Sequence, residues 1–333
     1  MIKEASFWHG NGKIKCYLCP HGCVIPKGKR GICGVRENRD GKLYTLIHSL
    51  CSSVYPDPIE KKPLFHFHPG TTALSLGTVG CNLKCLYCQN YTISQAKPED
   101  HILTDVPPEE AVKKAKEYGC EGIAWTYNEP TIWWEYTYDS AKIAKREGLY
   151  TVYVTNGFAG KDAIKEISPY LDAANVDIKA MNEEFYKKIC KARLQPVLDA
   201  CKMYKEMEVH LEITYLVIPG RNDSEKEIKK FSKWVIDEIG NGTPTHFSAF
   251  YPHYRMMDVP PTPMKTLLRA YDIAKSEGLD YIYIGNVPHG QYENTFCPAC
   301  ENKIIERYGF SAKIVGLKDG KCTKCGKKMG IIV

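Results

Sequence analysis

The middle of the chain repeats one unit, in which a helical segment ends at a glycine and a short apolar segment follows. Residues 141–154 read AKIAKREGLYTVYV and residues 271–284 read YDIAKSEGLDYIYI, and residues 111–127 have the same form. Ala, Val and Ile recur at three- and four-residue spacing in each predicted helix, which gives it one apolar face. The glycines that end the helices, where a left-handed backbone is common, are Gly119, Gly148 and Gly278. The repeat predicts parallel strands that alternate with helices.

Four further segments have the composition of strands. They are residues 73–77, 174–178, 210–218 and 245–251, and helix-length segments such as 224–239 lie between them. Six or seven strand–helix units predict an α/β fold, a full or partial (β/α) barrel. In such barrels the functional residues follow the carboxyl ends of the strands. The segments that follow the predicted strands are 80–88, 128–130, 155–157, 177–179, 219–223 and 252–253.

The composition of the chain indicates where the protein is found and how its cysteines are used. The 333 residues contain no run of about 18 apolar residues, and the N-terminus lacks the apolar core of a signal peptide. We therefore expect a cytoplasmic protein without a membrane partner, in which 15 cysteines favour metal sites over disulfides. The predicted domains are an N-terminal four-cysteine metal-binding region (1–55), a connecting segment (56–70), the barrel (71–290) and a C-terminal zinc ribbon (291–333).

Cys81, Cys85 and Cys88 form a C-x3-C-x2-C loop directly after the first predicted barrel strand. Structural zinc usually takes four ligands in two pairs. Three close cysteines without a fourth nearby in the sequence fit a 4Fe–4S cluster whose remaining iron is open to a substrate. A structural metal or a set of buried thiols is the alternative interpretation.

Two flanking sets of four cysteines have different spacing. Cys297, Cys300, Cys322 and Cys325 form two C-x2-C pairs, which is typical of a zinc ribbon. Cys16, Cys19, Cys23 and Cys33 have the spacing C-x2-C-x3-C-x9-C, for which zinc and an auxiliary iron–sulfur cluster both fit. We interpret the four scattered cysteines as small buried hydrophobic residues: Cys51, Cys120, Cys190 and Cys201.

The proline-rich segment 57–70 is predicted to be extended and rigid. It either lies over the mouth of the barrel, where it would define substrate access, or simply joins two domains.

The three-cysteine loop, with Tyr87 before its last cysteine, resembles the radical S-adenosylmethionine (SAM) superfamily, and more narrowly the activating enzymes of pyruvate formate-lyase type. Residues 126–130 (TYNEP) stand where that family has Gly-Gly-Glu-Pro, and 155–157 (TNG) and 177–179 (DIK) match later family motifs. Two departures are Tyr-Asn in place of Gly-Gly and Val154 in place of an Asp.

The resemblance implies that Cys81, Cys85 and Cys88 ligate the catalytic 4Fe–4S cluster. It implies that Glu129 contacts the methionyl ammonium of SAM, Lys179 its carboxylate, and Asp177 a cation or substrate amide. The full set of residues that it places around the cosubstrate is Tyr87, Asn128, Glu129, Thr155, Asn156, Asp177, Lys179 and His253.

A closer resemblance, to the "AmmeMemoRadiSam system" radical enzymes, extends over nearly the whole chain. It rests on DPIEKKPLFHFHPG at 57–70, on TYNEP, on IGNVPHGQYENTFCPAC at 284–300 and on both cysteine-rich flanks. The terminal KKMGIIV departs from that family's usual Pro-Gly-containing tail.

The function implied by these resemblances is that of an oxidoreductase that cleaves SAM reductively to a 5′-deoxyadenosyl radical for hydrogen abstraction. Activating enzymes imply a protein glycine as the target; another peptide residue or a small molecule is the alternative. A flavodoxin- or ferredoxin-type electron donor and an anaerobic setting follow.

Two other classes stay open: a metal-containing nucleic-acid- or protein-binding module, and an electron-transfer protein. Nucleic acid is disfavoured because only Tyr308 and Phe310 interleave with the lysines of the basic tail.

Overall fold

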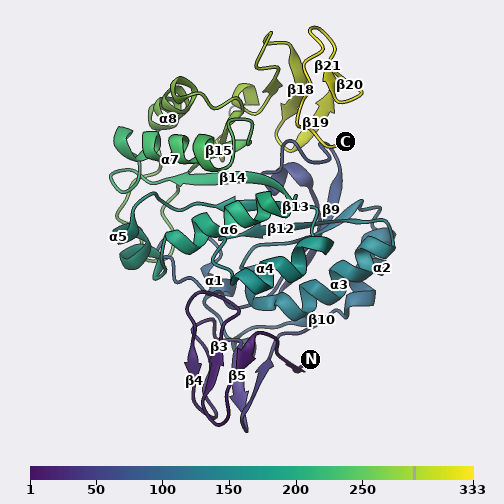
Figure 1. The fold of residues 1–333 in the computed structure, drawn as a ribbon, viewed down its shortest axis with the longest axis vertical. Coiled ribbons are helices and arrows are strands. Elements are labelled where there is room, and N and C mark those ends of the chain that lie inside the picture. Colours follow the sequence, from purple (N-terminus) through teal and green to yellow (C-terminus); the bar gives the residue numbers. More distant parts are fainter. Residues whose placement is uncertain (288–289) are drawn as a thin grey trace.

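The computed structural model describes residues 1–287 and 290–333 (Figure 1). Its centre is an eight-stranded sheet, in which seven neighbouring parallel strands form a partial (β/α) barrel, as predicted. The parallel strands, in spatial order, are β9 (Thr72–Gly77), β11 (Gly122–Trp125), β12 (Tyr150–Thr155), β13 (Ala173–Asp177), β14 (His210–Val217), β15 (Thr245–Ala249) and β16 (Ile282–Gly285). Strand β8 (Ser53–Pro58) pairs antiparallel with β9 at one edge.

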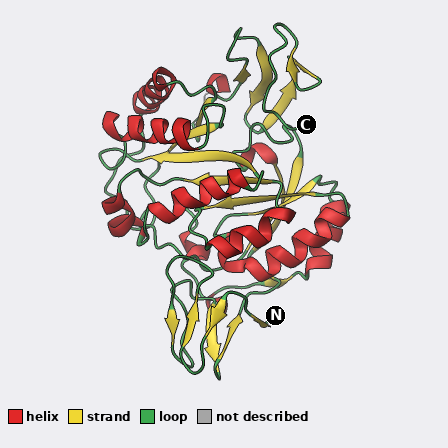
Figure 2. Cartoon of the chain, viewed as in Figure 1, coloured by secondary structure: helices red, strands yellow, loops and turns green. Residues whose placement is uncertain are grey.

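Amphipathic helices cover the outer face of this sheet (Figure 2). They are α2 (Pro108–Glu117), α3 (Trp134–Arg146), α4 (Lys161–Ile167), α6 (Gln195–Glu206), α7 (Glu225–Glu238) and α8 (Met264–Glu277), and short helices α1 (Tyr91–Ser94) and α5 (Glu183–Phe185) lie in loops. Helix α7 begins where predicted, because the Ser224 side chain accepts a hydrogen bond from the Glu227 amide. Gly278 ends α8 with φ of +110°, a left-handed conformation that favours glycine.

The segment after β8 closes the amino-terminal end of the barrel. Ile59, Leu64 and Phe67 pack against small inward-facing residues of four barrel strands, which are Ala73, Ala124, Val152 and Ala173. Because β8 runs antiparallel to β9, with Pro58 opposite Thr72, it delivers the chain to the end opposite the mouth. The segment therefore does not lie over the mouth, as one prediction had it, although Lys61 and Lys62 line the cavity that opens there, so it is more than a linker.

Two lobes built mainly of short strands flank the barrel at opposite ends of the molecule (Figure 1). The N-terminal lobe contains the sheets β1 (Lys3–Glu4)–β6 (Lys42–Thr45)–β5 (Arg36–Arg39) and β2 (Trp8–His9)–β3 (Ile14–Cys16)–β4 (Val24–Ile25). The C-terminal lobe contains β17 (Thr295–Phe296), β18 (Lys303–Tyr308) and β19 (Ser311–Ile314), with the hairpin of β20 (Leu317–Lys318) and β21 (Lys321–Cys322). Strands β7 (Leu50–Cys51) and β10 (Thr104–Asp105) pair beside the barrel.

Each lobe has its own small core that continues into the barrel. In the N-terminal lobe, Phe7 and Ile14 share a cluster with Trp134 of α3. In the C-terminal lobe, Ile304 and Ile305 share one with Tyr283 of β16. In the described part of the chain, no helix has both the length and the apolar content that a membrane crossing requires.

Candidate functional site

A cavity of about 400 Å³ opens at the carboxyl end of the barrel strands. Most of the predicted site residues line it together, namely Cys81, Cys85, Tyr87, Cys88, Asn128, Thr155, Asn156, Asp177 and Lys179. They come from the last residues of β12 and β13 and from the loops after β9, β11, β12 and β13, so the topology brings them to one place.

Backbone hydrogen bonds fix the three-cysteine loop at this mouth. The Lys84 amide donates to the Cys190 carbonyl (2.9 Å) and the Leu86 amide to the Ile189 carbonyl (3.1 Å). Gly80, with φ of +87°, begins the loop, and a Cβ at this position would lie 2.7 Å from the Cys33 carbonyl oxygen. A side chain at residue 80 would therefore displace the loop from the N-terminal lobe.

The three sulfurs fit an iron–sulfur cluster as a donor set. Cys81 Sγ accepts from the Leu83 amide (3.4 Å) and from Asn156 Nδ2 (3.7 Å), and Cys88 Sγ lies 3.1 Å from Ser94 Oγ. Such donors to sulfur are common around clusters and tune their potentials. Burial raises the pKa of the Cys81 thiol well above its usual range, so a bound metal must supply the positive charge that stabilises the thiolate.

Sequence spacing missed Cys190, a fourth cysteine beside this loop. It is fully buried, as predicted, at the end of a π-helical turn (Tyr186–Cys190). A hydrogen bond between the two thiols, together with burial, raises the pKa of Cys85 well above its usual range, and Tyr87 Oη lies 3.7 Å from Cys190 Sγ. Cys190 does not line the cavity, so it supports Cys85 from behind. No spacing rule connects residues this far apart.

Lys179 forms an ion pair at the mouth of the barrel. Its Nζ lies 2.5 Å from Asp177 Oδ2. Burial alone would lower the pKa of Lys179, but the Asp177 carboxylate outweighs burial and holds this pKa above its usual range. The ammonium group therefore stays charged and faces the cavity.

Glu129 and His253 are the two predicted site residues that do not line this cavity. The Glu129 carboxylate is fully buried and accepts from Thr155 Oγ1 (2.7 Å) and the Asn156 amide (2.8 Å). Its oxygens are thus occupied by the neighbouring strand end, where they orient two residues that do line the cavity. His253 is solvent-exposed in the loop after β15.

One end of the cavity is formed by residues of segment 57–70, for which a role in substrate access was one of the two predictions. Lys61 and Lys62 line it, and each donates to Asp57 at 2.7 Å. Tyr127 has φ of +72° where the resembling family has glycine, and its hydroxyl also donates to Asp57. Burial lowers the pKa of Lys62 to about 8, although Asp57 partly opposes this shift. Two lysines around one aspartate make this end of the cavity cationic.

The C-terminal four cysteines converge on one point. The sulfurs of Cys297, Cys300, Cys322 and Cys325 lie within 4.8 Å of one another. Cys297 and Cys325 are 3.6 Å apart, and Cys300 and Cys322 are 3.7 Å apart. Tetrahedral ligation at about 2.3 Å implies sulfur separations of about 3.8 Å, so this cluster fits a single metal ion.

We expect Cys325→Ala to remove one equivalent of metal and to unfold the C-terminal lobe. The lobe has a small core, and bound metal supplies much of the folding free energy in such cases. Metal analysis checks the loss of the ion. Limited proteolysis checks the unfolding, which should allow cleavage after about residue 296. Cys120→Ala, which alters a buried thiol outside every cluster, is the matched control. Full metal content in Cys325→Ala would contradict the prediction.

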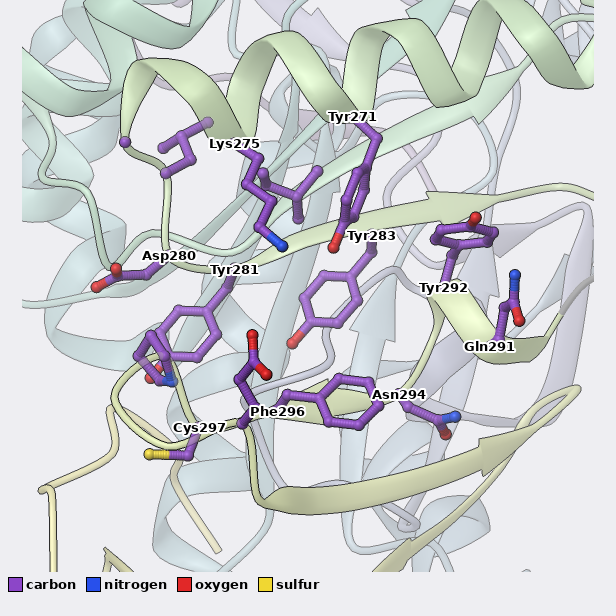
Figure 3. Close-up of a pocket in the computed structure, with 15 residues that line it drawn as sticks. Tyr271, Lys275, Asp280, Tyr281, Tyr283, Gln291, Tyr292, Asn294, Phe296 and Cys297 are labelled. Carbon is purple, nitrogen blue, oxygen red and sulfur yellow. The ribbon is translucent and has the colours of Figure 1, made fainter. Parts of the chain in front are cut away.

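A second and larger cavity, of about 560 Å³, lies between α8, β16 and the C-terminal lobe (Figure 3). Lys275 extends toward it from α8, and the rings of Tyr281, Tyr283 and Phe296 line it. The stretch Leu279–Tyr283 that forms its wall enters β16 at the amino-terminal end of the barrel. It is therefore distant from the three-cysteine loop and takes no part in that site.

The three-cysteine loop and most of the barrel lie in a region of the chain that matches a known family. Residues 75–232 match the family described as Radical SAM superfamily. The chain therefore contains a radical SAM domain, a type of domain that implies a 4Fe–4S cluster and SAM.

Relatives match either the whole chain or about half of it. An uncharacterized protein of Methanocaldococcus jannaschii is 46% identical over 336 residues, which cover all of both chains, so the match includes both cysteine-rich lobes. Pyruvate formate-lyase 1-activating enzyme of Escherichia coli strain K12 is 26% identical over 170 residues, 49% of this chain and 67% of the enzyme. A putative glycyl-radical enzyme activating enzyme of M. jannaschii is 29% identical over 49% of this chain and 62% of that protein.

Two solved structures share the fold. A radical SAM methyltransferase from Sphaerobacter thermophilus superposes with a TM-score of 0.51 at 16% identity, over 66% of this chain and 67% of the other. SuiB of Streptococcus suis, bound to S-adenosylmethionine, superposes with a TM-score of 0.51 at 13% identity, over 68% of this chain and 53% of the other. At these identities the likeness concerns the fold alone. Of the segments behind the closer family resemblance, Pro288 and His289 lie outside the described residues.

Proposed function

We propose that the chain is an enzyme that cleaves SAM reductively at a 4Fe–4S cluster held by Cys81, Cys85 and Cys88. The observation that carries the proposal is that these three sulfurs share one cavity with polar side chains from three neighbouring strand ends. The cluster would supply the electron that converts SAM into a 5′-deoxyadenosyl radical, which abstracts hydrogen from a substrate.

The chain's own residues would bind and orient the cosubstrate. Lys179 is the cation for the methionyl carboxylate, because it is charged and faces the cavity beside the loop. Thr155 and Asn156 present their side chains to the same space and are oriented by the buried carboxylate of Glu129. Glu129 therefore acts as a positioning residue in this proposal rather than as a direct ligand of the methionyl ammonium.

The proposed target is the Cα–H of a glycine on a partner protein, in a cytoplasmic and anaerobic setting. The names of the curated activating enzymes, which match about half of this chain, support this target. We place the chain in the AmmeMemoRadiSam branch, on the motifs at 57–70 and 126–130. The cationic end of the cavity at Lys61 and Lys62 favours the alternative, a small acidic substrate or an acidic peptide residue.

Deoxyadenosine formation tests the proposal. The full chain is purified anaerobically, loaded with iron and sulfide, and mixed with dithionite and SAM. We expect deoxyadenosine from the loaded protein and none without dithionite. SAM binding, measured by equilibrium dialysis, separates the outcomes. A fully loaded protein that neither binds nor cleaves SAM would contradict the proposal and favour an electron-transfer or recognition module.

A further inference from the structure

The N-terminal cysteines face a common enclosed cavity. Cys16, Cys19, Cys23 and Cys33 all line it, together with His21, Arg36 and apolar side chains. The β3–β4 hairpin sets two of them opposite each other, because the Cys16 amide donates to the Cys23 carbonyl (2.9 Å). The fold of the lobe therefore brings the four thiols together.

These four sulfurs do not have the spacing of a mononuclear site. Among residues 1–287 and 290–333, only the C-terminal cluster brings three or more ligand atoms within 4.8 Å of one another. The N-terminal set is absent from that group, and so is the set of Cys81, Cys85 and Cys88. A cubane holds its thiolates on separate iron corners, farther apart than the ligands of one zinc ion. In the distances between its sulfurs, the N-terminal set therefore resembles Cys81, Cys85 and Cys88 and differs from the C-terminal four cysteines.

The surroundings suit a cluster that exchanges electrons. Arg36 is 1% exposed, and its Nη1 donates to Cys16 Sγ at 3.6 Å. The Arg36 guanidinium also pairs with the buried carboxylate of Glu135, so it supplies a hydrogen-bond donor to a ligand sulfur with little net charge. Cys19, Cys23 and Cys33 are only partly buried, so a soluble donor can reach that edge.

The lobe contacts the radical-cluster loop on both sides of Cys81. The Cys33 carbonyl lies against Gly80, as the 2.7 Å approach to its Cβ position shows. His21 Nε2 lies 2.7 Å from the carbonyl oxygen of Asn82. Thus Cys33 contacts Gly80, the residue before Cys81, and His21 contacts Asn82, the residue after Cys81.

We propose that Cys16, Cys19, Cys23 and Cys33 hold an auxiliary iron–sulfur cluster that passes one electron at a time to the cluster of the radical loop. A one-electron protein donor of flavodoxin or ferredoxin class reduces the auxiliary cluster, which is reoxidised as it reduces the radical cluster. The relay rests on the proposed function of the radical loop. The predicted iron content of the N-terminal site does not depend on that function.

The first experiment counts iron in the full chain. After anaerobic loading, the wild type is expected to hold about eight irons, and Cys85→Ala and Cys23→Ala about four each, in line with one cubane at each site. Cys85→Ala should retain the electron paramagnetic resonance signal of a reduced cluster. A zinc ion at the N-terminal site, or no iron in Cys85→Ala, would overturn the proposal. This arm needs only the wild type and Cys85→Ala if Cys23→Ala does not fold.

The second experiment compares electron sources. Dithionite reduces the radical cluster directly, whereas a reduced flavodoxin would depend on the auxiliary cluster. In Cys23→Ala the ratio of the flavodoxin-driven to the dithionite-driven rate of SAM cleavage should fall about tenfold or more, since the relay is lost. An unchanged ratio would overturn the relay. No cleavage by wild type with two assembled clusters would instead count against the proposed function.

Discussion

Cys85→Ala should lower deoxyadenosine formation at least about a thousandfold, because the radical cluster cannot assemble on two ligands. Cys85 is 8% exposed and lines the cavity between the other two loop cysteines. The measurement is deoxyadenosine by chromatography after anaerobic incubation with dithionite and SAM. The rate should be normalised to protein that has been loaded with iron and sulfide.

The control is Cys201→Ala, which removes a buried thiol of α6 that belongs to none of the three clusters. This variant should lose some stability through its small cavity but keep its rate of SAM cleavage. Circular dichroism of both variants separates loss of the fold from loss of the cluster. A Cys85→Ala protein that folds and still forms deoxyadenosine at more than about a tenth of the wild-type rate would contradict the assignment of this loop.

Local patterns predicted most of the barrel and most of its cavity. The helix–glycine–strand repeat predicted α8 and β16 with Gly278 between them, since amphipathic spacing and a left-handed cap are local properties. The rule that functional residues follow the carboxyl ends of strands predicted Asn156 and Lys179 near the three cysteines, and all five line one cavity. Both steps need only short-range sequence information.

The rest depended on long-range packing that no local pattern contains. Cys190 lies next to Cys85 because a π-helical turn carries it under the loop. The segment 57–70 closes the bottom of the barrel because of the antiparallel direction of β8. The spacing of the four N-terminal cysteines predicted a shared metal site. It could not predict the distances between their sulfurs, and those distances distinguish one metal ion from a cluster.

The bottom of the barrel, opposite the cavity, contains a buried carboxylate that joins several elements. Glu212 of β14 has no solvent exposure. Its oxygens accept from the amides of Phe65 (2.9 Å) and His66 (2.7 Å) and from His246 Nε2 (2.7 Å). It thereby ties the segment that closes the barrel to two of the barrel strands.

Glu212→Ala should therefore destabilise the protein by about 3–5 kcal/mol, because it leaves buried donors without an acceptor. For a chain of this size the melting temperature should fall by about 5–15 °C.

Burial raises the pKa of Glu212, but hydrogen bonds from His210 and His246 outweigh burial and hold this pKa well below its usual range. The stabilisation from Glu212 is thus complete above the unfolded pKa of about 4.3 and is lost as pH falls through the lower folded value. The difference in melting temperature between wild type and Glu212→Ala should be largest near neutral pH and shrink in acid. Glu238→Ala, which removes an exposed carboxylate of α7, should change stability by less than about 0.5 kcal/mol. Equal melting temperatures for wild type and Glu212→Ala at pH 7 would show that the segment closing the barrel does not depend on this carboxylate.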